Sequence, residues 1–153
     1  MASVSDLVWD DTAQRLCWLA RQYAFLFGEE FVGTEHLLLA AAEVTPHDWH
    51  GYSGLTRDGV LNMIEALQGK RGGSELGDRR PRQPTPRARE AMETAAEHAV
   101  LGNRAVSIRD IWIGLLPDEE GLPNEILSRL GVAPMQLRKK LTEPSASPDH
   151  GGM

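Results

Sequence analysis

The side chains best suited to chemistry in this chain lie together in one short motif, Gly33-Thr34-Glu35-His36. A carboxylate beside an imidazole can act as a general acid and base. Catalysis would also need a nucleophile and a pocket, and neither is evident around the motif, so we do not expect an enzyme. In the simpler interpretation both residues lie in the first turn of a helix, where Glu35 serves the helix dipole and His36 packs or caps. We favour that interpretation, and keep a ligand contact as the alternative for Glu35.

Two other sets of reactive side chains are weaker candidates. His47, Asp48 and His50 could ligate a metal, but they lack a fourth ligand and a firm scaffold, so no metal site is predicted. Cys17 is the only cysteine and lies in an apolar run, where a buried, unreactive thiol is expected. A single cysteine excludes an intrachain disulfide and fits a reducing compartment. No cofactor is expected.

The composition limits the classes of partner. The 153 residues include 41% hydrophobic residues, enough for the core of one domain or of two small packed units. With a net charge of -6, the chain lacks the excess of Lys and Arg that binding to nucleic acid or an anionic membrane requires. The run Arg79-Arg80-Pro81-Arg82 is a local exception, for which a solvated surface is the simpler interpretation. Because no signal peptide or membrane-spanning apolar run is visible, we expect a cytoplasmic protein.

Apolar residues recur at helical spacing along most of the chain, and no stretch alternates as a strand does, so the sequence predicts an all-α fold. Thr34 and Thr56 are expected to cap helices, and Gly28 to end one. Residues 45–54 are expected to form a loop with at most one helical turn. The predicted helices run from about Asp10 to Phe27, Glu35 to Glu43, Arg57 to Leu67, Pro86 to Leu101, after Ser107 to Leu116, Pro123 to Leu130 and Pro134 to Leu141.

The first helix is apolar on more than one side. An inward stripe is formed by Ala13, Leu16, Ala20, Ala24 and Phe27. Trp18 and Phe25 lie away from that stripe. Either the rest of the domain covers these two side chains, or they form an exposed face for a partner, and the sequence leaves both interpretations open.

The second half of the chain repeats the first. The first-helix alanines Ala13, Ala20 and Ala24 fall on Ala88, Ala95 and Ala99 at an offset of 75 residues. Gly28 and Val32 fall on Gly102 and Val106 at an offset of 74. Two four-helix units, the third helix of the first being degraded, would form a pseudo-twofold bundle. The expected organisation is a lead-in over 1–8, a first repeat over 9–68, a flexible linker over 69–84, a second repeat over 85–142 and a disordered tail over 143–153.

These repeats resemble a known family. Val32 followed by the Gly-Thr-Glu-His motif, together with Thr85-Pro86-Arg87-Ala88-Arg89, is similar to the amino-terminal double-repeat domain of Clp-family AAA+ unfoldases, above all the ClpC branch. The resemblance extends from about Trp9 to Leu141. Because the sequence contains no Gly-x-x-x-x-Gly-Lys-Ser/Thr phosphate loop, we expect the recognition domain alone, without the ATPase modules.

The resemblance implies a ligand site in each copy. ClpC-like domains hold phosphoarginine, and the resemblance pairs each copy's first-helix Thr with the Glu of its own Gly-Thr-Glu-His motif. The hydroxyl and helix amides would take the phosphate, and the carboxylate the guanidinium. Here copy one has Asp10 and Glu35, and copy two has Thr85 and Arg109, so each site is expected to have lost one partner. Arg109 could instead receive a carboxylate or phosphate.

The resemblance implies a non-catalytic protein that binds a Clp ATPase, its adaptors, its substrates or a small-molecule ligand, as a regulator or decoy. The alternative is a transcriptional or signalling regulator that reuses the fold, suggested by the basic run at 79–82. No membrane partner is expected, and the acidic composition argues against nucleic acid.

Overall fold

The computed structural model describes residues 8–45, 55–68, 83–116 and 121–142. Within these ranges the chain is helical, without a strand beyond two isolated bridges, which confirms the all-α prediction. The helix bounds nearly coincide with those expected from the sequence. The helices are α1 (Asp11–Leu26), α2 (Thr34–Val44), α4 (Arg57–Gln68), α5 (Pro86–Leu101), α6 (Ile108–Leu115), α7 (Leu122–Arg129) and α8 (Pro134–Thr142).

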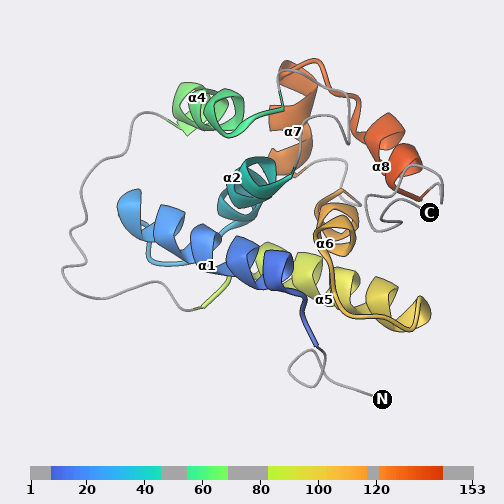
Figure 1. The fold of residues 1–153 in the computed structure, drawn as a ribbon. Coiled ribbons are helices and arrows are strands. Elements are labelled where there is room, and N and C mark those ends of the chain that lie inside the picture. The colour runs from blue at the N-terminus through green and yellow to red at the C-terminus, as the bar shows by residue number, and fades with distance from the viewer. Residues whose placement is uncertain (1–7, 46–54, 69–82, 117–120, 143–153) are drawn as a thin grey trace.

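The helices are arranged in three tiers (Figure 1). Helices α1 and α5 lie on one side, α2 and α6 in the middle, and α4, α7 and α8 on the other side. The middle helices are covered from both sides, and their sequences match that position. Every residue of α2 from His36 to Ala42 is buried, as is almost all of α6. A helix apolar on all sides is stable only in such a place.

A pseudo-twofold exchange of short segments joins the two copies. The segment before α1 pairs with the loop of copy two, through the bridge between Trp9 and Val106. The segment before α5 pairs in the same way with the loop of copy one, through the bridge between Val32 and Pro84. Each lead-in segment therefore lies against the helix corner of the other copy, and the duplicated architecture is confirmed.

The helix ends follow their local chemistry. Asp10 caps α1 by accepting a hydrogen bond from the Ala13 N–H (2.8 Å), and Thr85 caps α5 through the Ala88 N–H (3.1 Å). Gly28 ends α1 in the left-handed region, with φ of 72°, as predicted.

One of the predicted helix ends was wrong in detail. Thr34 is the first residue of α2 and does not cap it. The N-cap is Gly33, whose N–H donates to Nδ1 of His36 at 2.8 Å. In copy two Gly102 is the C-cap of α5, and the left-handed residue is the following one, Asn103, with φ of 53°. Asparagine tolerates this conformation because its short polar side chain can bond locally.

The core is continuous between the copies. The indole N–H of Trp112, in α6, donates to Oγ1 of Thr45, at the end of α2, at 2.9 Å, and both residues are buried. Gly114 lies so close to α5 that a Cβ at this position would come within 2.1 Å of the Ala91 carbonyl oxygen. Any larger residue would therefore push α6 away from α5.

The predicted linker and termini fall largely outside the described residues, as does the expected loop at 46–54. Of the linker, residues 83 and 84 are described, and Pro84 forms the bridge to Val32. The domain boundaries therefore stay a prediction.

Candidate functional site

The start of α2 presents a carboxylate at the surface. The side chain of Glu35 folds back over Gly33, so that a Cβ at Gly33 would lie only 1.8 Å from Glu35 Oε1. The other carboxylate oxygen accepts from Nε2 of Gln68, at the end of α4 (3.3 Å). An anion is favoured here because the amino end of a helix carries partial positive charge. Gly33 is required for this arrangement, because any side chain would displace the carboxylate.

Thr85 reaches this corner from the other copy. Its N–H donates to the Val32 carbonyl at 2.8 Å, and the Val32 N–H donates to the Gln83 carbonyl at 3.0 Å. These two bonds hold the start of α5 next to the start of α2. Thr85 therefore lines the same pocket as Glu35.

The Glu35–Thr85 pocket, defined by these two residues, has a volume of about 510 Å³. The first residues of α2, α5 and α7 border it, so three helix amino ends face one space. Arg87 also lines it. A smaller neighbouring pocket, with a volume of about 250 Å³, shares Arg87, Thr34 and Gly121 with it. The pocket thus combines one carboxylate, the two hydroxyls of Thr34 and Thr85, one guanidinium and three positive dipole ends.

The structure pairs the candidate ligand residues between the copies and not within one copy. The resemblance implied the pairs Asp10 with Glu35 and Thr85 with Arg109. The reciprocal bridges instead bring Thr85 next to Glu35. They bring Asp10 to the corner of copy two, where its N–H donates to the Val106 carbonyl at 2.9 Å. One pocket therefore keeps both the threonine and the glutamate.

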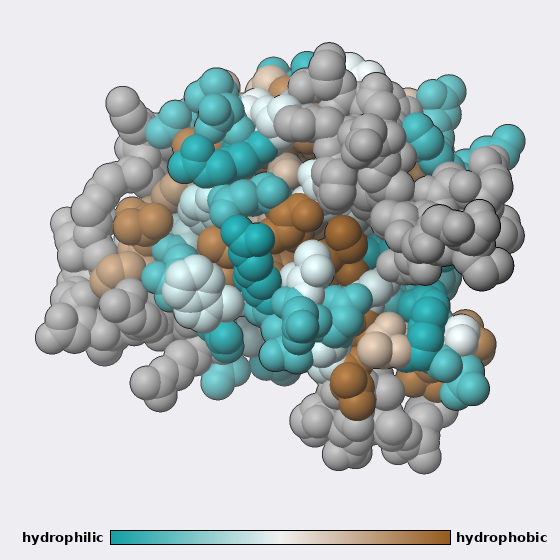
Figure 2. All heavy atoms as spheres, viewed as in Figure 1, coloured by the Kyte–Doolittle hydropathy of each residue, from teal (hydrophilic) through white to brown (hydrophobic). Residues whose placement is uncertain are grey.

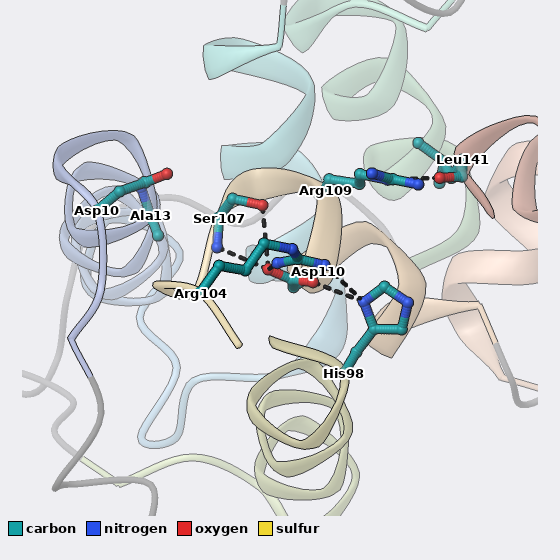
Figure 3. A network of polar contacts seen from close by, with 8 residues as sticks. All are labelled: Asp10, Ala13, His98, Arg104, Ser107, Arg109, Asp110 and Leu141. Carbon is teal, nitrogen blue, oxygen red and sulfur yellow. Dashed lines mark hydrogen bonds and ion pairs between the residues drawn. The ribbon is translucent and has the colours of Figure 1, made fainter. Parts of the chain in front are cut away.

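The corner of copy two is arranged differently (Figure 3). Arg109 points away from Asp10, and its Nε donates to the carbonyl of Leu141 at 2.5 Å, near the end of α8. Asp10 is engaged in capping α1. A guanidinium that binds a helix carboxyl end stabilises that helix. Arg109 therefore serves as a structural tie between α6 and α8.

Behind this corner lies an ionic network around the buried Asp110, which was not predicted from the sequence (Figure 3). Asp110 takes the place of His36 and accepts from the N–H (2.9 Å) and the hydroxyl (3.0 Å) of Ser107. Its carboxylate also binds Arg104 and accepts from Nδ1 of His98 at 2.6 Å. Burial would raise the pKa of Asp110, but the hydrogen bonds from Arg104, His98 and Ser107 together lower it below its ordinary value of 3.8.

The exposure of Trp18 and Phe25 on α1, which the sequence left open, differs between the two residues. Trp18 is 53% exposed, whereas Phe25 is only partly accessible. On the side of the molecule shown in Figure 2, hydrophobic side chains reach the surface in small groups bordered by hydrophilic ones. A groove runs beside Trp18, and we call it the Trp18 groove. Besides Trp18 it is lined by Val8, Trp9, Gln14, Arg15, Cys17 and Arg21, and Phe25 is not among its lining residues.

The other candidates can be placed as follows. Cys17 is partly exposed and lines the Trp18 groove, so the prediction of a buried side chain was wrong. Partial burial nevertheless raises the pKa of Cys17 to about 11, against a smaller opposite effect of Arg21, which favours an unreactive thiol. The trio of residues 47, 48 and 50 lies outside the described residues. Among those that are described, no three His, Cys, Asp or Glu side chains are grouped as a metal site would require. In the same ranges, no helix has the length and apolarity needed to cross a bilayer.

Comparison with known proteins gives relatives in sequence and in fold. No family model matches the chain. The negative regulator of genetic competence ClpC/MecB of Bacillus subtilis is 28% identical over 149 residues, which cover 92% of this chain and 17% of that protein. The chain thus spans less than a fifth of the length of the curated relatives it matches.

Two solved structures share the fold over most of their length. The N-terminal domain of the Clp protease-associated chaperone ClpD from Arabidopsis thaliana has a TM-score of 0.70 at 20% identity, covering 86% of this chain and 90% of that one. The Hsp104 N-terminal domain from Candida albicans has a TM-score of 0.68 at 15% identity, covering 95% and 93%. The predicted resemblance to Clp amino-terminal domains is confirmed, in sequence by ClpC/MecB and in fold by both structures.

Proposed function

We propose that this protein is a non-catalytic binding module of the Clp protease system, which recognises substrates or adaptors through the Glu35–Thr85 pocket. A chain with this pocket competes with the amino-terminal domain of a Clp ATPase for the same ligands, and so acts as a regulator or decoy in the cytoplasm. The supporting observation is that the pocket retains a threonine from one copy and a glutamate from the other.

The chemistry of the pocket suits a phosphorylated guanidinium, the side chain of phosphoarginine. The Glu35 carboxylate can accept two parallel bonds from a guanidinium. The Thr85 hydroxyl accepts from the Ala88 N–H and still has its own proton to donate to a phosphate oxygen. Arg87 and the amino ends of α2, α5 and α7 add positive charge for the phosphate. We therefore assign phosphoarginine-bearing segments to this pocket, and none to the corner of Asp10 and Arg109.

Calorimetric titration with a phosphoarginine-containing peptide tests the proposal. Glu35→Gln and Thr85→Val should each weaken binding at least about tenfold, because each removes a partner of a charged group. Asp10→Asn and Arg109→Gln are the matched controls from the other corner, and should change the affinity less than about twofold. Absence of binding to the native chain, or equal losses at both corners, would refute the assignment.

The partner assignment has its own test. A pull-down with the native chain should recover a Clp ATPase, an adaptor or a degradation substrate, and Glu35→Gln should reduce the yield of substrate. The alternative role as a transcriptional or signalling regulator was suggested by residues 79–82, which lie outside the described residues. Within the described ranges no observation favours it.

A further inference from the structure

The Trp18 groove is separate from the Glu35–Thr85 pocket and shares no lining residue with it. Its volume is about 710 Å³. The exposed indole of Trp18 and the 72% exposed side chain of Val8 form its apolar part. Exposed aromatic side chains beside a groove are typical anchors for a partner's apolar residue.

The charged side chains of the groove are both arginines. Arg15 and Arg21 lie three residues before and after Trp18, which places all three on one face of α1. Both are exposed, and neither forms an ion pair with another described residue. In a chain of net charge -6, a groove whose charges are both positive departs from the surface as a whole.

The duplication provides an internal comparison. At the offset of 75 that superposes α1 on α5, Trp18 falls on Glu93 and Arg15 on Glu90. At these two positions copy two is acidic where copy one is basic and aromatic, whereas Arg21 falls on Ala96 and Gln14 on Arg89. The two copies have the same helix at this point, so the fold does not require these side chains on α1. A binding role built on these side chains would therefore belong to copy one and not to copy two.

We infer that the Trp18 groove binds an acidic peptide segment carrying an aromatic or large apolar residue. The apolar residue packs on Trp18 and Val8, and the flanking carboxylates pair with Arg15 and Arg21. This inference rests on the proposed role in protein binding and specifies the chemistry of a second partner contact. Nucleic acid is disfavoured, because two arginines neutralise few phosphates and the whole chain repels a polyanion.

Fluorescence anisotropy with labelled decapeptides tests the inference. The first peptide carries Glu residues on both sides of a central Phe. In the second peptide Gln replaces every Glu, and in the third peptide Lys replaces every Glu. The native chain should bind the first at least about tenfold more tightly than the others. Trp18→Ala should weaken its binding at least about tenfold and Arg21→Glu at least about fivefold. Arg89→Glu, the same charge reversal on α5, should change it less than about twofold.

Other outcomes would overturn the inference. These are equal affinity for the three peptides, unchanged affinity in Trp18→Ala, or tighter binding of a single-stranded oligonucleotide or of anionic vesicles than of the acidic peptide. Circular dichroism confirms that the variants fold, which is expected because these side chains are exposed. If the acidic peptide fails while Glu35-dependent binding of phosphoarginine persists, only this inference falls. If both ligands fail, the proposed function falls as well.

Discussion

Replacing Asp110 with asparagine should destabilise the fold strongly, because the change removes the acceptor of a buried ionic network. Asp110 is fully buried and binds Arg104 and His98. Asparagine keeps one oxygen that can accept from the Ser107 N–H, so the cap of α6 survives. The substitution therefore removes the negative charge without removing the cap. The variant therefore tests the ionic contacts rather than the helix start.

The magnitude follows from burial. Removing one partner of a buried ion pair costs about 3–5 kcal/mol, because the other charge is left unpaired. The side chains of His98 and Arg104 are 32% and 30% exposed, so water can partly solvate them after the change. We therefore expect Asp110→Asn to lower the free energy of unfolding by about 2–3 kcal/mol at pH 7.

Urea unfolding followed by circular dichroism measures this loss, and Glu125→Gln is the matched control. Glu125 also pairs with an arginine, Arg129, at 3.3 Å, but the side chains of both are about half exposed. Its loss should cost less than about 0.5 kcal/mol. A difference of less than about 1 kcal/mol between the two variants would refute the reasoning that burial gives the Asp110 network its strength.

The pH dependence of stability provides a second test with the same variant. The pKa of Asp110 is lower in the folded than in the unfolded chain, so the unfolded chain takes up a proton first as the pH falls. The stabilisation is therefore complete at neutral pH, and is lost as the pH drops below about 4 and through the folded pKa. The difference between the native chain and Asp110→Asn should therefore shrink as the pH falls below about 4.

Three further predictions concern packing and reactivity. Gly114→Ala should lower the melting temperature, at a cost of about 1–3 kcal/mol, because the new methyl group meets the Ala91 carbonyl oxygen; Arg89→Ala, on the exposed side of α5, is the control. Tyr23→Phe should cost about 1 kcal/mol in urea unfolding, because the Tyr23 hydroxyl accepts from Nε of Arg57 (2.9 Å) and bonds Glu43; an unchanged midpoint would show these bonds to be neutral. The Cys17 thiol, with a pKa of about 11, should react slowly with a disulfide reagent at pH 8 and quickly once urea unfolds the chain, and equal rates would contradict the desolvation that raises this pKa.

Local chemistry allowed the helices and the duplication to be predicted. Aspartate, threonine, proline and glycine mark helix ends by short-range bonding, so the end of α1 at Gly28 was predicted from sequence alone. Asp10 and Thr85, which cap α1 and α5, act by the same local bonding. Where two residues compete for one role, the sequence cannot decide. Thr34 and Gly33 both fit the start of α2, and the cap falls to Gly33 because His36 reaches back to its N–H.

The site was harder to predict because its parts are distant in the chain. An alignment of the copies superposes Asp10 on Thr85 and Glu35 on Arg109, which suggests a pair within each copy. In the structure each lead-in segment instead lies at the corner of the other copy, so that Thr85 lies beside Glu35. The bridges at Val32 and Val106 show this arrangement. The Asp110 network had one signal in the sequence. An aspartate at the position of the buried His36 needs a cation nearby.

The central claim is that one pocket takes Glu35 from the first copy and Thr85 from the second. A double-mutant cycle on the affinity for a phosphoarginine peptide tests it most directly. We predict that Glu35→Gln and Thr85→Val are coupled by more than about 0.5 kcal/mol, and that Glu35→Gln and Asp10→Asn are additive. Additivity of the first pair, or coupling of the second, would contradict the pairing between copies.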